Sequence, residues 1–359
     1  MKQVFLVLVI TFICNQSYSQ GCVAIRGTGA VCTMQNAGDH GGGWQINTSY
    51  RYFESFRHFR GKEEQKERLE QNTEVINWQH SVDIAVVRQF NNRWSLLVGL
   101  PVLANKRSSL YEHGRTERHN SGSFGIGDMR LTAYRWMLDP QKSIKGNLQL
   151  GLGLKLPTAD YNYQDYFHNV GPNKTKELRP VDQSIQLGDG GTGIITELNG
   201  FYNFSQHFGL YSNFYYLLNP REVNGTRTFR ETLSPALANE SIMSVADQYM
   251  VRAGFVYAFA KNLKGLSVST GARIEGIPVN DLVGGSLGFR RPGYVVSVEP
   301  GINYTLDKST IFLTVPVAFS RNRTQSVTDK ERTQLSGVHT QGDAAFADYS
   351  VSIGATFRL

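Results

Sequence analysis

Apolar and polar residues alternate along most of the chain from Trp44 onward. The clearest run, residues 147–158 (NLQLGLGLKLPT), places five leucines on one face and Gln149, Lys155 and two glycines on the other. Strict alternation over this length predicts a β-strand with one apolar face. The same pattern recurs over residues 43–55, 76–88, 94–103, 125–136, 194–204, 208–218, 249–259, 266–277, 294–306, 311–321 and 346–359. We therefore expect an all-β chain of about twelve strands.

The connections between these segments alternate between short and long. The short ones are residues 90–93, 139–143, 205–207, 261–265 and 307–309, and the long ones are 55–72, 105–123, 160–193, 219–248, 278–293 and 322–345. Loops as long as these are unusual in a compact soluble domain. The arrangement predicts a transmembrane antiparallel β-barrel with short periplasmic turns and long extracellular loops.

The two faces of the strands indicate which side contacts lipid. A small soluble barrel has an apolar interior, whereas here the polar face carries ten charged residues of both signs. Each unpaired ion buried in a dry core would cost several kcal/mol, and a hydrated lumen removes that cost. We therefore predict that the apolar face contacts lipid and that the charged residues line the lumen. They are Arg51, Asp83, Asp128, Arg130, Lys155, Glu197, Arg252, Arg273, Glu275 and Glu299.

The first residues predict export. Residues 1–20 have one lysine, a short apolar run and small residues at Ser17 and Ser19, which is the layout of a secretory signal peptide. The run is shorter than the roughly 20 apolar residues of a spanning helix. Cleavage would leave a periplasmic N-terminal segment, residues 21–43, before a barrel of residues 44–359. We expect the bacterial outer membrane as the location.

Cys22 and Cys32 are the two cysteines that remain after such a cleavage. An oxidising compartment favours a disulfide between them. The closed segment, GCVAIRGTGAVC, carries Arg26 near its centre, and we expect it to plug the lumen or to contact a periplasmic partner through Arg26. A copper-type site from Cys22, Cys32, Met34 and His40 is the alternative.

The histidines give little sign of catalysis or metal binding. Five of them fall in predicted outer loops without H-x-x-x-H spacing, so we interpret them as solvated and expect no metal and no cofactor. They are His58, His113, His119, His168 and His339. His80 is the only histidine in a predicted strand, on the lipid face, and no serine motif accompanies it as a phospholipase-type site would require. We therefore expect no enzyme.

Charge also limits the partners. The formal net charge is +7, but the basic residues are scattered among acids, which argues against nucleic acid. Residues 56–72 are dense in both charges, could form a short helix, and are suited to bridging lipopolysaccharide phosphates.

Three stretches resemble a known family. GIGDMRLTAYRW (125–136), GLGLKLPTADY (151–161) and QLGDGGTGI (186–194) are similar to outer-membrane transporters of the phenol meta-cleavage-pathway type, which are distantly similar to the fatty-acid-transporter class. The family usually has Gly where this chain has Ala159 after Leu-Pro-Thr. The resemblance covers residues 44–359 and implies an outer-membrane barrel with a transport role. The leader, which ends in Gln, resembles those of Bacteroidetes proteins.

These observations lead to one functional hypothesis and two alternatives. We expect a monomeric channel that passes a small polar or amphipathic solute through a charged lumen, with the N-terminal segment as a gate. In the first alternative, the lumen charges pair and seal the barrel, and the long loops bind a partner protein, a peptide or an envelope component at the cell surface. An outer-membrane enzyme is the second alternative.

Overall fold

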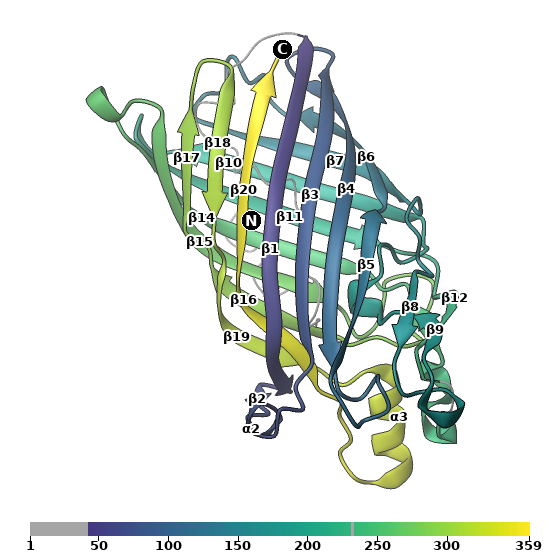
Figure 1. The fold of residues 1–359 in the computed structure, drawn as a ribbon. Coiled ribbons are helices and arrows are strands. Elements are labelled where there is room, and N and C mark those ends of the chain that lie inside the picture. The colour runs from purple at the N-terminus through teal and green to yellow at the C-terminus, as the bar shows by residue number, and fades with distance from the viewer. Residues whose placement is uncertain (1–41, 231–232) are drawn as a thin grey trace.

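The chain folds into a closed antiparallel β-barrel of twelve strands (Figure 1), as predicted. The computed structural model describes residues 42–230 and 233–359. Three of the strands are interrupted and count as two segments each. In order around the wall, the strands are β1 (Gly43–Arg60), β3 (Ile76–Gln89), β4 (Trp94–Ser109), β5 (His119–Ile126) with β6 (Met129–Trp136), β7 (Gly146–Leu156), β10 (Gly193–Asn203), β11 (Phe208–Leu218), β14 (Gln248–Ala258), β15 (Leu266–Ile277), β16 (Gly293–Val298) with β17 (Gly301–Thr305), β18 (Ser309–Thr314) with β19 (Val317–Arg323), and β20 (Ala344–Arg358).

The last strand closes the barrel on the first. β20 pairs with β1 from the short-turn end, where Arg358 lies opposite Gln45, to the loop end, where Ala344 lies opposite Phe59. Two of the three strand interruptions contain a proline, Pro300 or Pro316, which cannot donate to the ladder. The third falls between β5 and β6. Closure of β20 on β1 leaves neither of these two strands as a sheet edge, as a membrane barrel requires, whereas β5 pairs with β4 alone.

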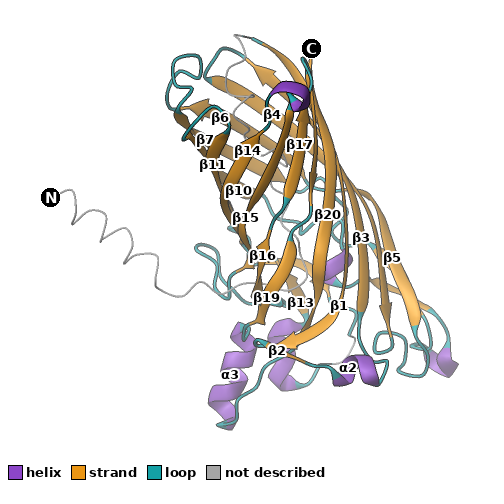
Figure 2. Ribbon diagram, turned by 90° about the vertical axis from the view of Figure 1, so that its left-hand side faces the viewer, coloured by secondary structure: helices purple, strands orange, loops and turns teal. Residues whose placement is uncertain are grey.

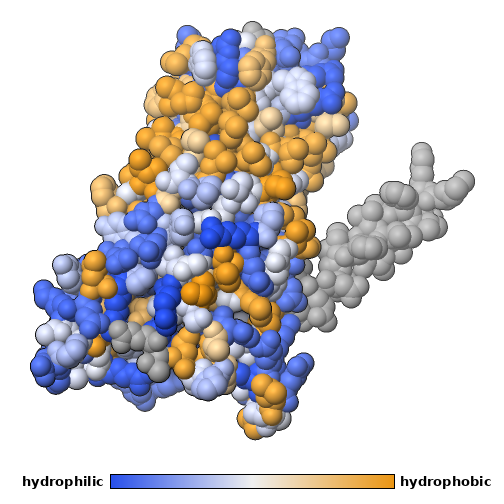
Figure 3. Space-filling view, turned by 90° about the vertical axis from the view of Figure 1, so that its right-hand side faces the viewer, coloured by the Kyte–Doolittle hydropathy of each residue, from blue (hydrophilic) through white to orange (hydrophobic). Residues whose placement is uncertain are grey.

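The outward face of the wall is apolar and the inward face is polar. Leu152 of β7 is 62% exposed, whereas Lys155 on the opposite face is 3% exposed. Figure 3 shows apolar side chains gathered as a band on one side of the barrel, between polar side chains at the short turns and at the loop end. The strand faces therefore follow the predicted alternation.

The end of the barrel opposite the short turns carries the long connections (Figure 2). They contain β2 (Glu63–Glu64), two short helices, α2 (Glu67–Glu70) and α3 (Val327–Ser336), and two hairpins, β8 (Gln164–Phe167) with β9 (Glu177–Pro180) and β12 (Val223–Arg227) with β13 (Ile242–Ser244). Short 3-10 turns complete this end: η1 (Pro172–Lys174), η2 (Gln183–Ile185) and η3 (Pro235–Glu240); η4 (Lys261–Leu263) lies in a short turn at the other end. Among the described residues, no helix is long and apolar enough to cross a membrane.

Several strands run farther toward the loop end than the sequence predicted. β1 continues to Arg60, β4 to Ser109, and β5 already begins at His119, so parts of the predicted loops 55–72 and 105–123 are strand. Above the lipid both faces of a strand contact water or loops, so the ladder continues while the alternation of apolar and polar residues disappears. The expectation of a short helix in residues 56–72 agrees with α2.

Candidate functional site

The connection between β7 and β10 folds back into the barrel. We call residues 181–191 of this connection the inward loop. Its backbone is held by polar groups of β3 and β4: Gln79 Nε2 donates to the Ser184 carbonyl at 2.7 Å and Asn105 Nδ2 donates to the Ile185 carbonyl at 3.3 Å. Ile185 is fully buried. A segment that the sequence presented as an outer connection therefore lies inside the wall.

The three stretches that carry the family resemblance meet at Asp128, in the interruption between β5 and β6. The Asp128 carboxylate accepts hydrogen bonds from the backbone N–H groups of Ala159 (3.2 Å) and Asp189 (3.3 Å). Thr158 also stabilises this interruption, because its hydroxyl donates to the Gly127 carbonyl at 3.1 Å. A side chain at Gly188 would lie 2.5 Å from an Asp128 carboxylate oxygen, so only glycine permits this approach.

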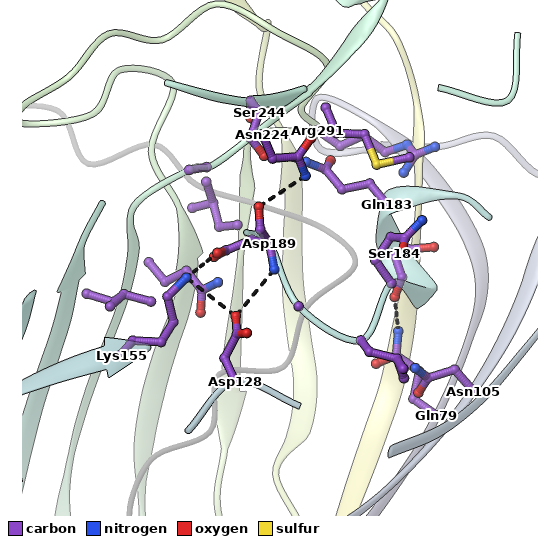
Figure 4. Close-up of a pocket in the computed structure, with 18 of the residues that line it drawn as sticks. Gln79, Asn105, Asp128, Lys155, Gln183, Ser184, Asp189, Asn224, Ser244 and Arg291 are labelled. Atoms are coloured by element: carbon purple, nitrogen blue, oxygen red, sulfur yellow. Dashed lines mark hydrogen bonds and ion pairs between the residues drawn. The ribbon is translucent and has the colours of Figure 1, made fainter. Parts of the chain in front are cut away.

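Lys155 supplies the positive charge of this junction (Figure 4). Its ammonium group forms an ion pair with Asp189 and lies 3.7 Å from Asp128 Oδ2. The side chains of Lys155 and Asp128 are 4% and 9% exposed, and that of Asp189 is 22% exposed. One lysine thus links a wall carboxylate to a carboxylate of the inward loop.

A second ionic contact holds the other end of the inward loop. The Arg291 guanidinium donates to both oxygens of Asp182, at 2.9 Å and 2.7 Å. Arg107 lies 3.5 Å from the same carboxylate and is paired with Glu112 at 2.6 Å. Burial of Asp182 opposes ionisation, but the charges of Arg107 and Arg291 outweigh it and hold the pKa of that carboxyl well below its usual range.

Two cavities lie in series and share one lining residue. The inner cavity, about 130 Å³, is lined by the inward loop, Lys155 and Asp128. The outer one, which we call the vestibule, has about 850 Å³ and is formed by the long connections. Arg291 lines both cavities, so the Asp182–Arg291 pair lies where they meet.

The predicted lumen residues on β14 and β15 lie together on the inner wall. Glu299, at the interruption between β16 and β17, accepts from Arg252 at 3.1 Å and from Arg273 at 3.0 Å. Arg273 also pairs with Glu275 at 2.7 Å, and Arg252 Nε donates to Asn213 at 2.6 Å. This polar network follows neighbouring strands around the wall.

The remaining predicted lumen residues also lie on the inward face, each beside a wall neighbour. Asp128 and Lys155 belong to the junction described above; the others are Arg51, Asp83, Glu197 and Arg130, which also lines the inner cavity. Their contacts are the Tyr134 hydroxyl to Glu197 (2.9 Å), the Ser81 hydroxyl to Asp83 (3.4 Å), Arg130 over the Tyr215 ring (5.4 Å) and Arg51 over the Phe53 ring (6.0 Å).

The partners contributed by the loops were not identified from the sequence. Asp182, Asp189 and Arg291 lie in predicted connections, where charged residues are common and carry no periodic pattern. The QLGDGG stretch contains Asp189, but its resemblance indicated a family and not a contact with Lys155.

Two of the outer histidines are buried, which corrects the prediction that they are solvated. His58 belongs to β1, is 5% exposed, and hydrogen-bonds Asp343 through Nδ1 at 3.0 Å. Its Nε2 accepts from the Val75 N–H at 2.8 Å, so this His–Asp pair has no free nitrogen to act as a base. His58 and His119 also lie in strands, so His80 is not the only strand histidine.

His113 is fully buried and packs with His119 and His168 at ring distances of 5.5 and 5.7 Å. Burial and the two neighbouring histidines lower the pKa of His113 to about 4. His113 Nδ1 accepts from the His168 N–H at 3.0 Å. Within the described ranges, no group of three or more His, Cys, Asp or Glu side chains could hold a metal ion.

His80, on the outward face, hydrogen-bonds the Tyr50 hydroxyl at 2.7 Å. Arg26, Cys22, Cys32 and the alternative copper ligands lie outside the described residues.

Comparison with known proteins supports the architecture. No protein-family model and no curated relative matches the sequence. Among solved structures, an outer-membrane channel from Pseudomonas putida F1 is similar with a TM-score of 0.57 and 10% identity, covering 94% of this chain and 100% of that one. The toluene transporter TodX of Pseudomonas putida follows at a TM-score of 0.43 and 8% identity, covering 94% and 95%. The monoaromatic hydrocarbon channel CymD has a TM-score of 0.41 and 8% identity, covering 95% and 98%. At these identities the first likeness shows the fold alone: the chain has the fold of an outer-membrane β-barrel.

Proposed function

We propose that the chain is an outer-membrane channel for a small polar solute and that the inward loop is its gate. The observation that carries the proposal is the pair of cavities in series, which meet at Arg291 beside the Asp182 carboxylate. The likeness in fold to a bacterial outer-membrane channel supports it.

The contacts of the inward loop are suited to reversible docking. Polar side chains and two ionic contacts, at Lys155 and at Asp182, hold it, and Val181, Ile185 and Leu187 are its buried apolar side chains, with Leu187 packed on Leu103 and Ala159. Ionic and hydrogen-bonding groups that leave their partners in a hydrated lumen are solvated by water, so their separation costs far less than exposure of a large apolar surface.

The lining of the inner cavity favours a polar solute over a hydrocarbon. Amide and hydroxyl groups of Gln79, Asn105 and Ser184 line it together with Lys155 and Asp128. These groups are hydrogen-bonded within the protein, and a polar solute can also bond to their remaining donor and acceptor positions, whereas a hydrocarbon cannot.

Single-channel recording in planar bilayers tests the proposal. The wild-type chain is expected to conduct above background, and Asp182→Asn is expected to be open for a larger fraction of time, because it removes the charge that holds Arg291 and Arg107. Asp160→Asn is the matched control, since Asp160 lies exposed in the same connection. Absence of conductance in the wild type and in Asp182→Asn, with a folded barrel, would contradict the proposal.

A second candidate function is a non-conducting barrel whose loops bind a partner. The paired charges of Arg252, Arg273, Glu275 and Glu299 favour it, because paired charges can fill a lumen as well as line one. The N-terminal segment is proposed as an additional gate. Recording with and without residues 21–43 separates its effect from that of the inward loop.

A further inference from the structure

The vestibule has an excess of positive charge. Nine arginine side chains and four carboxylates line it, and the lining contains no lysine. Arginine presents a planar fork of N–H groups that matches the oxygens of a carboxylate or a phosphate. The composition of the lining therefore points to anions rather than to neutral polar molecules.

Six of the nine arginines are already paired with carboxylates. Three of the paired carboxylates do not themselves line the vestibule, and counting them reduces the excess from five positive charges to two. The pairs are Arg68–Asp343 (2.8 Å), Arg107–Glu112 (2.6 Å), Arg179–Glu177 (2.6 Å), Arg290–Asp281 (2.7 Å), Arg291–Asp182 (2.7 Å) and Arg323–Asp329 (3.3 Å).

Arg115, Arg230 and Arg332 form no ion pair with any other described residue. Two of them are supported by aromatic rings: Arg115 lies 5.8 Å from the centre of the Tyr111 ring and Arg230 lies 5.6 Å from that of Phe229. Stacking holds the plane of a guanidinium and leaves its N–H edge available to a ligand.

A buried arginine, Arg323, lines the same vestibule. Arg323 is 3% exposed, and its Nε has no hydrogen-bond partner. Its one carboxylate partner, Asp329, also accepts from the Ser326 N–H at the start of α3. The field of Arg323 therefore adds to the positive potential of the vestibule.

The Asp182–Arg291 pair shows how an anion fits at the inner end. Both oxygens of Asp182 accept from the Arg291 fork, which also lies 4.6 Å over the Phe289 ring. A solute carboxylate or phosphate could take the same geometry, and it would then compete with Asp182 for Arg291. Such an exchange would couple arrival of the solute to release of the inward loop.

We propose that the vestibule binds a small anion that carries a carboxylate or phosphate group, and that Arg291 receives this group in exchange for Asp182. This inference rests on the proposed channel function for its transport step, but binding in the vestibule does not require conduction. Arg115, Arg230 and Arg332 capture the anion. The other five paired arginines keep the vestibule walls in place.

Calorimetric titration of inorganic phosphate into the detergent-solubilised full chain tests the binding. The triple variant Arg115→Gln, Arg230→Gln and Arg332→Gln is expected to weaken phosphate binding by about tenfold or more, because each bond from a charged donor contributes measurably. The matched control removes three exposed positive charges from the short-turn end, by Arg93→Gln, Lys142→Gln and Lys264→Gln, and should bind phosphate as the wild type does. Equal losses in both triple variants, or no phosphate binding by the wild type, would overturn the proposal.

Bilayer recordings separate this inference from the proposed function. We call the triple variant of Arg115, Arg230 and Arg332 the vestibule variant. In a KCl gradient the wild type should be anion-selective, and the vestibule variant should be less selective for anions. Conduction without anion preference overturns the inference and leaves the channel standing. If the chain does not conduct, but the wild type binds phosphate and the vestibule variant does not, the inference is supported and the channel is refuted. Displacement of phosphate by lipopolysaccharide micelles would assign the site to a lipid headgroup and overturn a free solute as its ligand.

Discussion

Replacing Lys155 by methionine should release the inward loop. Methionine keeps a long unbranched side chain but removes the charge that joins Asp189 to Asp128. The two carboxylates then face each other without a cation, and the Asp189 N–H is left to hold the loop to Asp128 at 3.3 Å. We expect the docked and released positions of the loop to shift toward release.

The size of the shift follows from the burial of the three groups. Removal of one partner from a buried ion pair costs about 3–5 kcal/mol. Asp189 is 22% exposed and remains partly solvated, so a value at or below the lower end of this range, about 2–3 kcal/mol, is expected. Since each 1.4 kcal/mol is tenfold, the equilibrium should move by about 30- to 150-fold toward the released loop.

Single-channel open probability is the readout. Lys155→Met should raise it, and Asp128→Asn in the same chain should reduce the effect, because the repulsion between the carboxylates is then removed. Lys174→Met, an exposed lysine in the same connection, is the control. If Lys155→Met and Lys174→Met both have the open probability of the wild type in folded barrels, the inward loop is not held by this ion pair and the reasoning is refuted.

Three further predictions concern the wall, the outer loops and the N-terminus. Gly151→Ala places a Cβ 2.6 Å from the Tyr134 ring, so it should destabilise the barrel by about 1–3 kcal/mol in thermal or urea unfolding. The loss of stability should be clearly smaller in a Tyr134→Ala background, and an equal loss in both backgrounds would exclude this clash as the cause. The pKa of His113 is lowered to about 4, so its neutral form stabilises the outer loops fully above pH 6.5, and this contribution is lost as the pH falls from 6.5 to 4. Hydrogen exchange of residues 110–118, corrected for intrinsic rates, should therefore accelerate between pH 7 and pH 5 in the wild type but not in His113→Gln, and an equal acceleration in both would assign the effect to another group. Cys22 and Cys32 should resist alkylation until a reductant is added, and labelling of both thiols without reduction would exclude the disulfide.

The sequence determined the barrel wall. Lipid on one side and a hydrated lumen on the other impose opposite polarity on successive residues, so alternation predicted the strands and their number. Lys155 and the leucines around it on β7 illustrate this, because their orientation is fixed by position along one strand. The structure differs from the prediction at the outer ends of strands, as for His58 on β1, and at the three strand interruptions, as at Asp128.

The tertiary structure alone decided what occupies the lumen. Asp182 and Arg291 are separated by 109 positions, and no local pattern relates them. The sequence identified strand or lumen positions at Gln79, Lys155 and Asp128. Their partner is the inward loop, which belongs to a long connection, and the length of that connection permits a path outside or inside the barrel. Docking of that loop depends on ion pairs and hydrogen bonds between distant segments. These contacts require the closed wall, which brings the segments together. The wall therefore follows from local alternation, whereas the position of the inward loop depends on long-range ion pairs and hydrogen bonds.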